Sequence, residues 1–212
     1  MNIQLMKDID EKQFQYSKPR INTFGGQSVF ITLNENKLRL QTPRCAVPNG
    51  ISTFKTQLDE EKLSIALDLD SSTESMKLFK AFLERFDSQN IEEATTKSLV
   101  WFKKHLTKDV IEQLYRKQMQ NNTMKIKLLT KKGEFDGNIF DKNNKKISLK
   151  HIKPGCKVRI IAECIGMYFV PNEFGMTWKA LQIKIEEDAK TITGYSFLDD
   201  DEEEMFDDAE PV

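Results

Sequence analysis

Aromatic rings beside positive charges are the residues of this chain best suited to do chemistry, and they concentrate between residues 157 and 186. Trp178 is followed directly by Lys179, and Tyr168 and Phe169 follow Arg159 on the preceding segment. Flat rings can stack on unpaired bases and cations can neutralise phosphates, which is the chemistry of single-stranded nucleic-acid binding. The competing interpretation is that these rings are core residues, because most aromatic side chains on strands are buried.

Two long strands joined by an aromatic connection must position these side chains. In the first strand, Val158, Ile160, Ala162 and Cys164 alternate with other residues, which predicts one buried and one partly solvated face. The alternation also places the Cys164 thiol in the core, where we expect it to be inert.

The second strand changes its apolar face part-way along. Phe174, Met176 and Trp178 share one side, whereas Leu181 and Ile183 share the opposite side further on. Such a change is common where a sheet curls into a small barrel, so the segment predicts a curved sheet with core residues on one side and an aromatic row on the other.

The rest of the chain predicts more strands and a helical insertion. Alternating apolar residues indicate a hairpin over 27–43 and strands at 63–69 and 124–130. Between them, apolar residues at helical spacing predict three helices, with a capping box at 71–74, a second helix from about Ile91 and a third near Thr107. The expected class is therefore α+β, a curved antiparallel β-barrel with a helical insertion at about 71–120.

Other cations and one further ring lie on the predicted sheet or in the loops beside it. Basic side chains on outward strand positions are the residue type that contacts phosphates, and exposed rings are the type that stacks on bases. The expected phosphate-binding residues are Arg39, Arg44, Lys55, Lys125, Lys127, Arg159 and Lys179. The expected stacking residues are Phe54, Tyr168, Phe169 and Trp178.

The net charge of −1 hides an uneven distribution. Residues 191–212 hold nine acidic side chains and no lysine or arginine, so the preceding residues, with 32 basic and 24 acidic side chains, carry +8. A basic body favours polyanionic partners. We therefore divide the chain into a loosely ordered lead-in (1–23), a barrel domain (24–197) and a disordered acidic tail (198–212), which is too acidic to fold alone.

Several classes of protein find no support in the sequence. It has no phosphate-binding glycine loop, no signal peptide, and no apolar run of the roughly 18 residues that a membrane-spanning helix needs. Two histidines and three cysteines without metal-site spacing argue against zinc, and the cysteines are expected to be reduced in an intracellular protein. Asp68 and Asp70 are more typical of a cap for the following helix than of a Mg²⁺ site. We expect no enzyme, no cofactor and no metal.

Four segments resemble a protein family of nucleocytoplasmic large DNA viruses. They are LRLQTPRCAVPNGIS, SLVWFKK, CKVRIIAECIGMYFVPNEFGMTWKALQIKI and GYSFLDDDEEE, which in order and spacing cover most of residues 25–204. That family is similar to the single-stranded-DNA-binding protein of African swine fever virus. The resemblance implies an OB-fold core, a role in viral DNA replication, repair or recombination, and a location at the viral replication site in the host cytoplasm, with the virion as a further location.

The leading hypothesis is a sequence-tolerant binder of single-stranded DNA. Its acidic tail would dock replication proteins or compete with DNA for the basic surface, and a homo-oligomer is left open. The alternative is a viral structural or assembly protein without nucleic-acid affinity, and a solubilising role for the tail is also open. Apolar anchors for docking by the tail would be Met205, Phe206, Pro211 and Val212.

Overall fold

The computed structural model describes residues 3–4, 6, 9–21, 26–55 and 61–189. The helices are η2 (Glu11–Gln13), α1 (Glu74–Thr96), α2 (Ser98–Phe102), α3 (Lys108–Leu114) and η3 (Leu149–His151). The N-terminal strands are β1 (Phe14–Tyr16), β2 (Arg20–Ile21), β3 (Gln27–Val29), β4 (Ile31–Leu33), β5 (Asn36–Lys37), β6 (Arg39–Gln41), β7 (Cys45–Val47), β8 (Ile51–Lys55) and β9 (Glu61–Asp68). The later strands are β10 (Tyr115–Arg116), β11 (Met119–Gln120), β12 (Thr123–Leu128), β13 (Thr130–Lys131), β14 (Glu134–Phe135), β15 (Asn138–Phe140), β16 (Lys146–Ile147), β17 (Cys156–Val170) and β18 (Glu173–Glu187).

Five of these strands close a barrel. Strand β7 pairs with β9, β9 with β12, β12 with β18, β18 with β17, and β17 again with β7. All these pairings are antiparallel except β12 with β18, which is parallel. The predicted α+β class with an OB-fold-like barrel and a helical insertion is confirmed.

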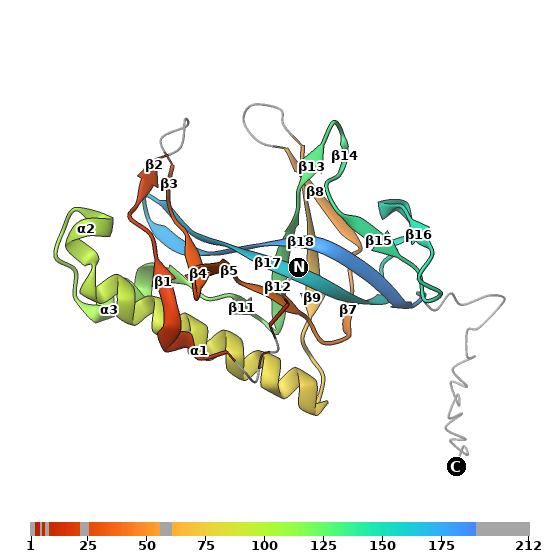
Figure 1. The fold of residues 1–212 in the computed structure, drawn as a ribbon, viewed down its shortest axis with the longest axis horizontal. Coiled ribbons are helices and arrows are strands. Elements are labelled where there is room, and N and C mark those ends of the chain that lie inside the picture. The colour runs from red at the N-terminus through yellow and green to blue at the C-terminus, as the bar shows by residue number, and fades with distance from the viewer. Residues whose placement is uncertain (1–2, 5, 7–8, 22–25, 56–60, 190–212) are drawn as a thin grey trace, which may run out of the picture.

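The long hairpin β17–β18 wraps across the barrel (Figure 1). Its register shifts at three places, between Lys157 and Val158, between Ile161 and Ala162, and between Cys164 and Gly166. In the second shift Ile161 pairs with Gln182 and Ala162 with Ala180, so Leu181 is the extra residue on β18. A bulge of this kind bends a strand and reverses the alternation beyond it, which explains the predicted change of apolar face.

The helical insertion lies between β9 and β12 and covers one side of the sheet (Figure 1). Helix α1 buries Phe79, Phe82, Leu83 and Phe86, the apolar residues at helical spacing. Thr73 is its N-cap residue but makes no side-chain capping hydrogen bond, so the predicted capping box does not form. The prediction that a second helix starts near Ile91 is wrong, because α1 continues through that position to Thr96.

Polar residues in the middle of α1 belong to a buried network. The Asp87 carboxylate accepts hydrogen bonds from the Tyr115 hydroxyl (2.7 Å) and from the backbone and side-chain N–H groups of Gln118 (3.1 and 2.8 Å). The Asn90 amide donates to the Tyr115 hydroxyl at 2.9 Å and accepts from Tyr16 at 2.9 Å. Asp and Asn residues usually favour helix ends, because their side chains compete for backbone hydrogen bonds. Inside α1, hydrogen bonds to other parts of the fold satisfy the side chains of Asp87 and Asn90.

The N-terminal lead-in was expected to be loose, but part of it is built into the fold. Strand β1 pairs with β4, and Phe14 is buried against Phe86, with 4.3 Å between ring centroids. Strand β2 pairs with β3, which in turn pairs with the far end of β17. The predicted boundaries at residues 24 and 197 remain predictions, and residues 190–212, with the anchors Met205, Phe206, Pro211 and Val212, lie outside the described residues. Within the described chain, no helix is long and apolar enough to cross a membrane.

The buried network predicts a large cost for Asp87→Ala. The change leaves the donors of Tyr115 and Gln118 without their acceptor, and an unsatisfied buried group costs about 1–3 kcal/mol. We expect the free energy of unfolding, measured by urea denaturation, to fall by about 2–4 kcal/mol. The matched control Asp136→Ala, at an exposed position between β14 and β15, should change it by less than about 0.5 kcal/mol. Equal effects of the two changes would contradict a structural role for the network.

Candidate nucleic-acid interface

A row of paired residues crosses the outer face of the barrel. Residues that pair directly across neighbouring strands place their side chains on the same face. The row runs through the pairs Ser52–Ser64, Ser64–Lys127, Lys127–Lys179, Lys179–Glu163 and Glu163–Arg39. It brings three of the predicted phosphate-binding cations, from strands far apart in the sequence, onto one surface.

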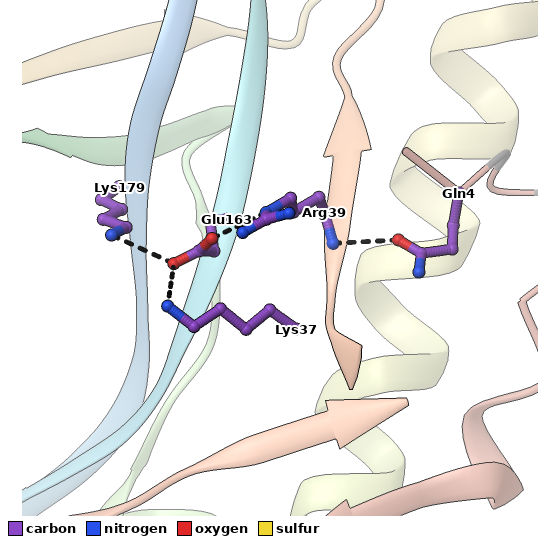
Figure 2. A network of polar contacts seen from close by, with 5 residues as sticks. All are labelled: Gln4, Lys37, Arg39, Glu163 and Lys179. Carbon is purple, nitrogen blue, oxygen red and sulfur yellow. Dashed lines mark hydrogen bonds and ion pairs between the residues drawn. The ribbon is translucent and has the colours of Figure 1, made fainter. Parts of the chain in front are cut away.

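Glu163 organises the cations at one end of this row (Figure 2). Its carboxylate, which is 4% exposed, is 2.7 Å from Arg39 Nε, 3.0 Å from Lys179 Nζ and 3.3 Å from Lys37 Nζ. Burial on its own raises the pKa of Glu163, but the hydrogen bonds from Arg39, Lys179 and Lys37 outweigh it and hold the pKa below its ordinary value. Because one carboxylate faces three cations, the cluster keeps a net charge of about +2 at neutral pH.

Arg39 and Lys179, both predicted to contact phosphate, thus form ion pairs with Glu163 in this structure. Their side chains are each 24% exposed, whereas Lys37 is 63% exposed. Lys37 was not predicted, since its short strand β5 directly follows a turn and gives no periodic signal. It is the member of the cluster most open to a ligand.

A hollow of about 570 Å³ opens beside the row, between β12 and β18. Lys125 and Lys127 from β12 line it together with Arg116 and Lys117, and no acidic residue is among its described lining residues. The Glu173 carboxylate beside it lies 3.6 Å from Arg116. Burial, followed by the nearby charges of Lys62 and Lys125, lowers the pKa of Lys127. We call the hollow, with these four cations, the basic groove.

The expectation that Trp178 and Phe169 present their rings to solvent is not met. Trp178 is 2% exposed and Phe169 9% exposed. The Trp178 ring meets Phe86 edge-on at 6.2 Å, and its Nε1 donates to Gln118 at 2.5 Å. The Phe169 ring stacks on Phe174 at 5.4 Å. The competing interpretation of these two rings as core residues holds, so only an edge of Trp178 contributes to the groove lining.

The reason is the alternation of side chains along a strand. Lys179 lies on the outer face, so its neighbour Trp178 points inward. Tyr168 likewise lies on the groove side, so Phe169 points to the helical insertion, where it contacts Trp101 at 5.8 Å. Neither pair of adjacent predicted residues can share one face.

Tyr168 lies in the groove lining and is half-buried. Its hydroxyl donates a hydrogen bond to Glu173 at 3.0 Å. Burial, with the Glu173 carboxylate, raises the pKa of Tyr168 to about 12, so the ring stays neutral at physiological pH. Tyr168 therefore remains a candidate for stacking.

Phe54 is the most exposed of the predicted rings, at 61%. It pairs with Lys62 across β8 and β9, and Lys55 pairs with Glu61 in the next position. The β8–β9 hairpin extends away from the body of the barrel (Figure 1). A ring that the fold leaves in solvent beside a lysine suits stacking on a base.

Arg44 and Arg159 lie away from the basic groove. Arg44 is 3.8 Å from Glu187, and Arg159 is 3.6 Å from Glu186. Both line a different hollow, formed by residues around Thr42 and Asp70. The structure therefore does not bring these two predicted cations together with Lys125 and Lys127.

The groove contains cations that the sequence pattern did not reveal. Arg116 and Lys117 follow the third helix, where basic residues are common, and they reach the groove because β10 pairs with β18 through Tyr115–Phe174 and Arg116–Gly175. Lys62 lies outside the groove lining and pairs with Phe54 across β9 and β8. The sequence shows only that these residues are basic. Strand pairing decides which basic residues lie together in the site.

The described residues include no group of three or more His, Cys, Asp or Glu side chains that could hold a metal ion. The Asp68 carboxylate accepts the backbone N–H of Asp70 at 2.8 Å and so closes the turn before α1. The thiols of Cys45, Cys156 and Cys164 are free and buried. Burial raises the pKa of Cys45 to about 12, so this thiol is protonated and unreactive at neutral pH.

The Glu163 cluster predicts a pH-dependent stability. Because the folded-state pKa of Glu163 lies below its ordinary value of 4.5, the carboxylate stabilises the fold fully above that value and progressively less as pH falls through the folded pKa. We expect Glu163→Gln to lower the free energy of unfolding at pH 7 by about 1–3 kcal/mol. The deficit should shrink below about pH 4.5.

Urea denaturation across a pH series checks this, with Glu134→Gln at an exposed position as the control. A Glu163→Gln deficit that stays constant down to acid pH would show that the ion pairs are not its source.

Known proteins resemble this chain chiefly in fold. Comparison with curated protein sequences gives no match. The crystal structure of gp2.5, a single-stranded DNA-binding protein encoded by bacteriophage T7, aligns with a TM-score of 0.50 and 11% identity over 74% of this chain and 91% of that chain. The single-stranded DNA-binding protein from bacteriophage Enc34 in complex with single-stranded DNA aligns with a TM-score of 0.45 and 14% identity over 81% of this chain and 96% of that chain.

The similarity to gp2.5 shows a shared fold, in agreement with the barrel topology. A protein-family model matches residues 55–199, which include β9, β12, β17, β18, the helical insertion and all four cations of the basic groove. Since the match spans more than half of the sequence, the chain belongs to the family of unknown function DUF5871.

Proposed function

We propose that this protein binds single-stranded DNA without catalysis and with little sequence preference. The observation that carries the proposal is the basic groove, in which Arg116, Lys117, Lys125 and Lys127 line one hollow without an acidic residue among its described lining. Four cations in a concave surface suit a chain of phosphates better than an isolated anion. The Tyr168 ring in the same lining gives a base a flat surface.

Phosphate neutralisation would provide most of the affinity. Each lysine or arginine that contacts a phosphate releases condensed counterions, so affinity should fall with rising salt. Burial and, after it, the nearby charges of Lys62 and Lys125 destabilise the charged form of Lys127, and a phosphate would offset the repulsion from the two lysines. Phe54, on the hairpin at the edge of the same face, would stack on a second base.

The proposed biological role, the location and the function of the acidic tail rest on the sequence. The resemblance to proteins of nucleocytoplasmic large DNA viruses supports a role in viral DNA replication, repair or recombination at the replication site in the host cytoplasm. The nine acidic residues from Asp199 onward support docking of basic partner proteins or competition with DNA for the groove. The similarity to phage proteins described as single-stranded DNA-binding agrees with this proposal.

Removing the two groove lysines should reduce the salt dependence of binding. For Lys125→Gln with Lys127→Gln, we expect the slope of log K against log salt concentration to become less steep by about 1.4, since each single-strand phosphate contact contributes about 0.7. Fluorescence anisotropy with a labelled oligothymidylate across a salt series measures this. Lys77→Gln, an exposed lysine on α1, is the matched control and should leave the slope unchanged.

Absence of single-strand binding by the unmodified protein, or tighter binding to duplex than to single strands, would overturn the proposal. Equal slopes for the double variant and the control would show that DNA does not use the basic groove.

Phe54 predicts a separate stacking contribution. Phe54→Leu keeps an apolar side chain but removes the ring face, and we expect it to weaken binding by about 1 kcal/mol, because stacking of a base on an aromatic ring contributes roughly 1–3 kcal/mol. Phe54→Trp should preserve the affinity. The same anisotropy titration at fixed salt measures both variants, and equal affinities of the Leu and Trp variants would show that the ring does not stack.

A further inference from the structure

The sheet continues past the barrel on the side of the β17–β18 turn. There β2 pairs with β3, β3 with β17, β17 with β18, and β18 with β10. Direct pairing places one residue from each strand in a single row, namely Arg20, Ser28, Tyr168, Gly175 and Arg116. Tyr168 and Arg116 belong to the groove lining, so the row leads out of the groove toward the N-terminal strands.

The neighbouring row settles which way these side chains face. It contains Ile21, Gln27, Phe169, Phe174 and Tyr115. Phe169 contacts Trp101 at 5.8 Å, and the Gln27 side chain donates to the Trp101 carbonyl oxygen at 2.8 Å. Gln27 and Phe169 thus pack on the helical insertion, whereas Ile21 at the end of the row is 75% exposed. Because side chains alternate along a strand, the row of Arg20 and Tyr168 faces the opposite side, which is the side of the groove.

Gly175, in the middle of the row, has no side chain to project from the sheet. A Cβ at this position would lie 3.0 Å from the Arg116 carbonyl oxygen and 3.2 Å from the Tyr168 hydroxyl. These approaches are tighter than ordinary van der Waals contact, so the absence of a side chain lets Tyr168 and Arg116 lie close together. Ser28, which pairs with both Tyr168 and Arg20, has a small side chain that leaves the surface between them open.

Arg20 at the far end of the row has an aromatic partner. Its guanidinium carbon lies 5.3 Å from the ring centroid of Phe30, which is 39% exposed. In the part of the chain that the structure describes, no carboxylate forms an ion pair with Arg20. A base can stack on such an exposed ring while a neighbouring phosphate binds the guanidinium.

We propose that Arg20 and Phe30 form a second contact site for single-stranded DNA, which lengthens the path of the strand beyond the basic groove. The inference rests on the proposed function and adds to it a site outside the barrel. From β10 to β2 the row crosses four strand spacings, about 19 Å at about 4.8 Å each. A stacked strand with about 3.4 Å per nucleotide would place at most about six nucleotides along it. Oligonucleotides that fill only the groove would not reach Arg20.

The test compares a short and a long oligothymidylate, of about 4 and about 30 nucleotides, because four stacked nucleotides are too few to span the row of about six from the groove to Arg20. For the long strand, Arg20→Gln should weaken binding about two- to fivefold and make the salt slope less steep by about 0.7. Phe30→Ala should also weaken it about two- to fivefold, with no change of slope. For the short strand, both variants should bind as the unmodified protein does. Lys77→Gln and Leu99→Ala, at exposed positions on α1 and α2, are the matched controls.

The outcomes separate this inference from the proposed function. Unchanged binding of the long strand by both variants, with the groove-lysine variant still impaired, would overturn the second site and leave the groove intact. Equal losses for short and long strands would also overturn it, since the two residues would then act within the groove or through the fold. Thermal unfolding of each variant identifies loss of structure, and Arg20→Lys, which keeps the charge, should retain the salt slope if Arg20 contacts phosphate. Failure of the unmodified protein to bind either strand would overturn the proposed function itself.

Discussion

The pairing of β17 with β18 over fifteen residues each is the constraint on which the rest of the structure depends. These two strands contribute to the barrel, to the extension that carries β2 and β3, and to the attachment of the helical insertion through β10. A flat hairpin of this length could not join all three, because its faces would keep the same side inward throughout. Three register shifts bend the hairpin and let its buried face change as the sheet curls.

Once the hairpin is bent, strict alternation distributes its side chains between two environments. Trp178, Phe169 and Phe174 meet the aromatic residues of the helical insertion, whereas Lys179 and Tyr168 face outward. The aromatic residues therefore serve mainly to join the insertion to the barrel. The surface chemistry comes from cations on neighbouring strands, with Tyr168 and Phe54 as the rings that remain accessible.

Electrostatics divides the outer face into a part whose cations surround a carboxylate and a part whose cations do not. Glu163 holds Lys37, Arg39 and Lys179 in one cluster and fixes their positions (Figure 2). A few residues away, Lys125 and Lys127 have no such carboxylate in the described part of the chain. A polyanion gains most where positive charge is uncompensated, so the same face contains a structural and a binding region. The family model covers the groove but not Arg20 and Phe30, which belong to the N-terminal strands.

The sequence by itself determined the α+β class, the two long strands with their change of face, the buried stripe of α1 and the asymmetric charge, because each depends on local periodicity or composition. It also identified Lys125, Lys127, Tyr168 and Phe54 as candidates by residue type. Only the tertiary structure decided that Trp178 and Phe169 are buried, that Arg39 and Lys179 are shared with Glu163, and that Arg116 and Lys117 join the groove. The physical reason is that exposure and charge balance depend on which strands pair, and pairings such as Lys127 with Lys179 join residues more than fifty positions apart.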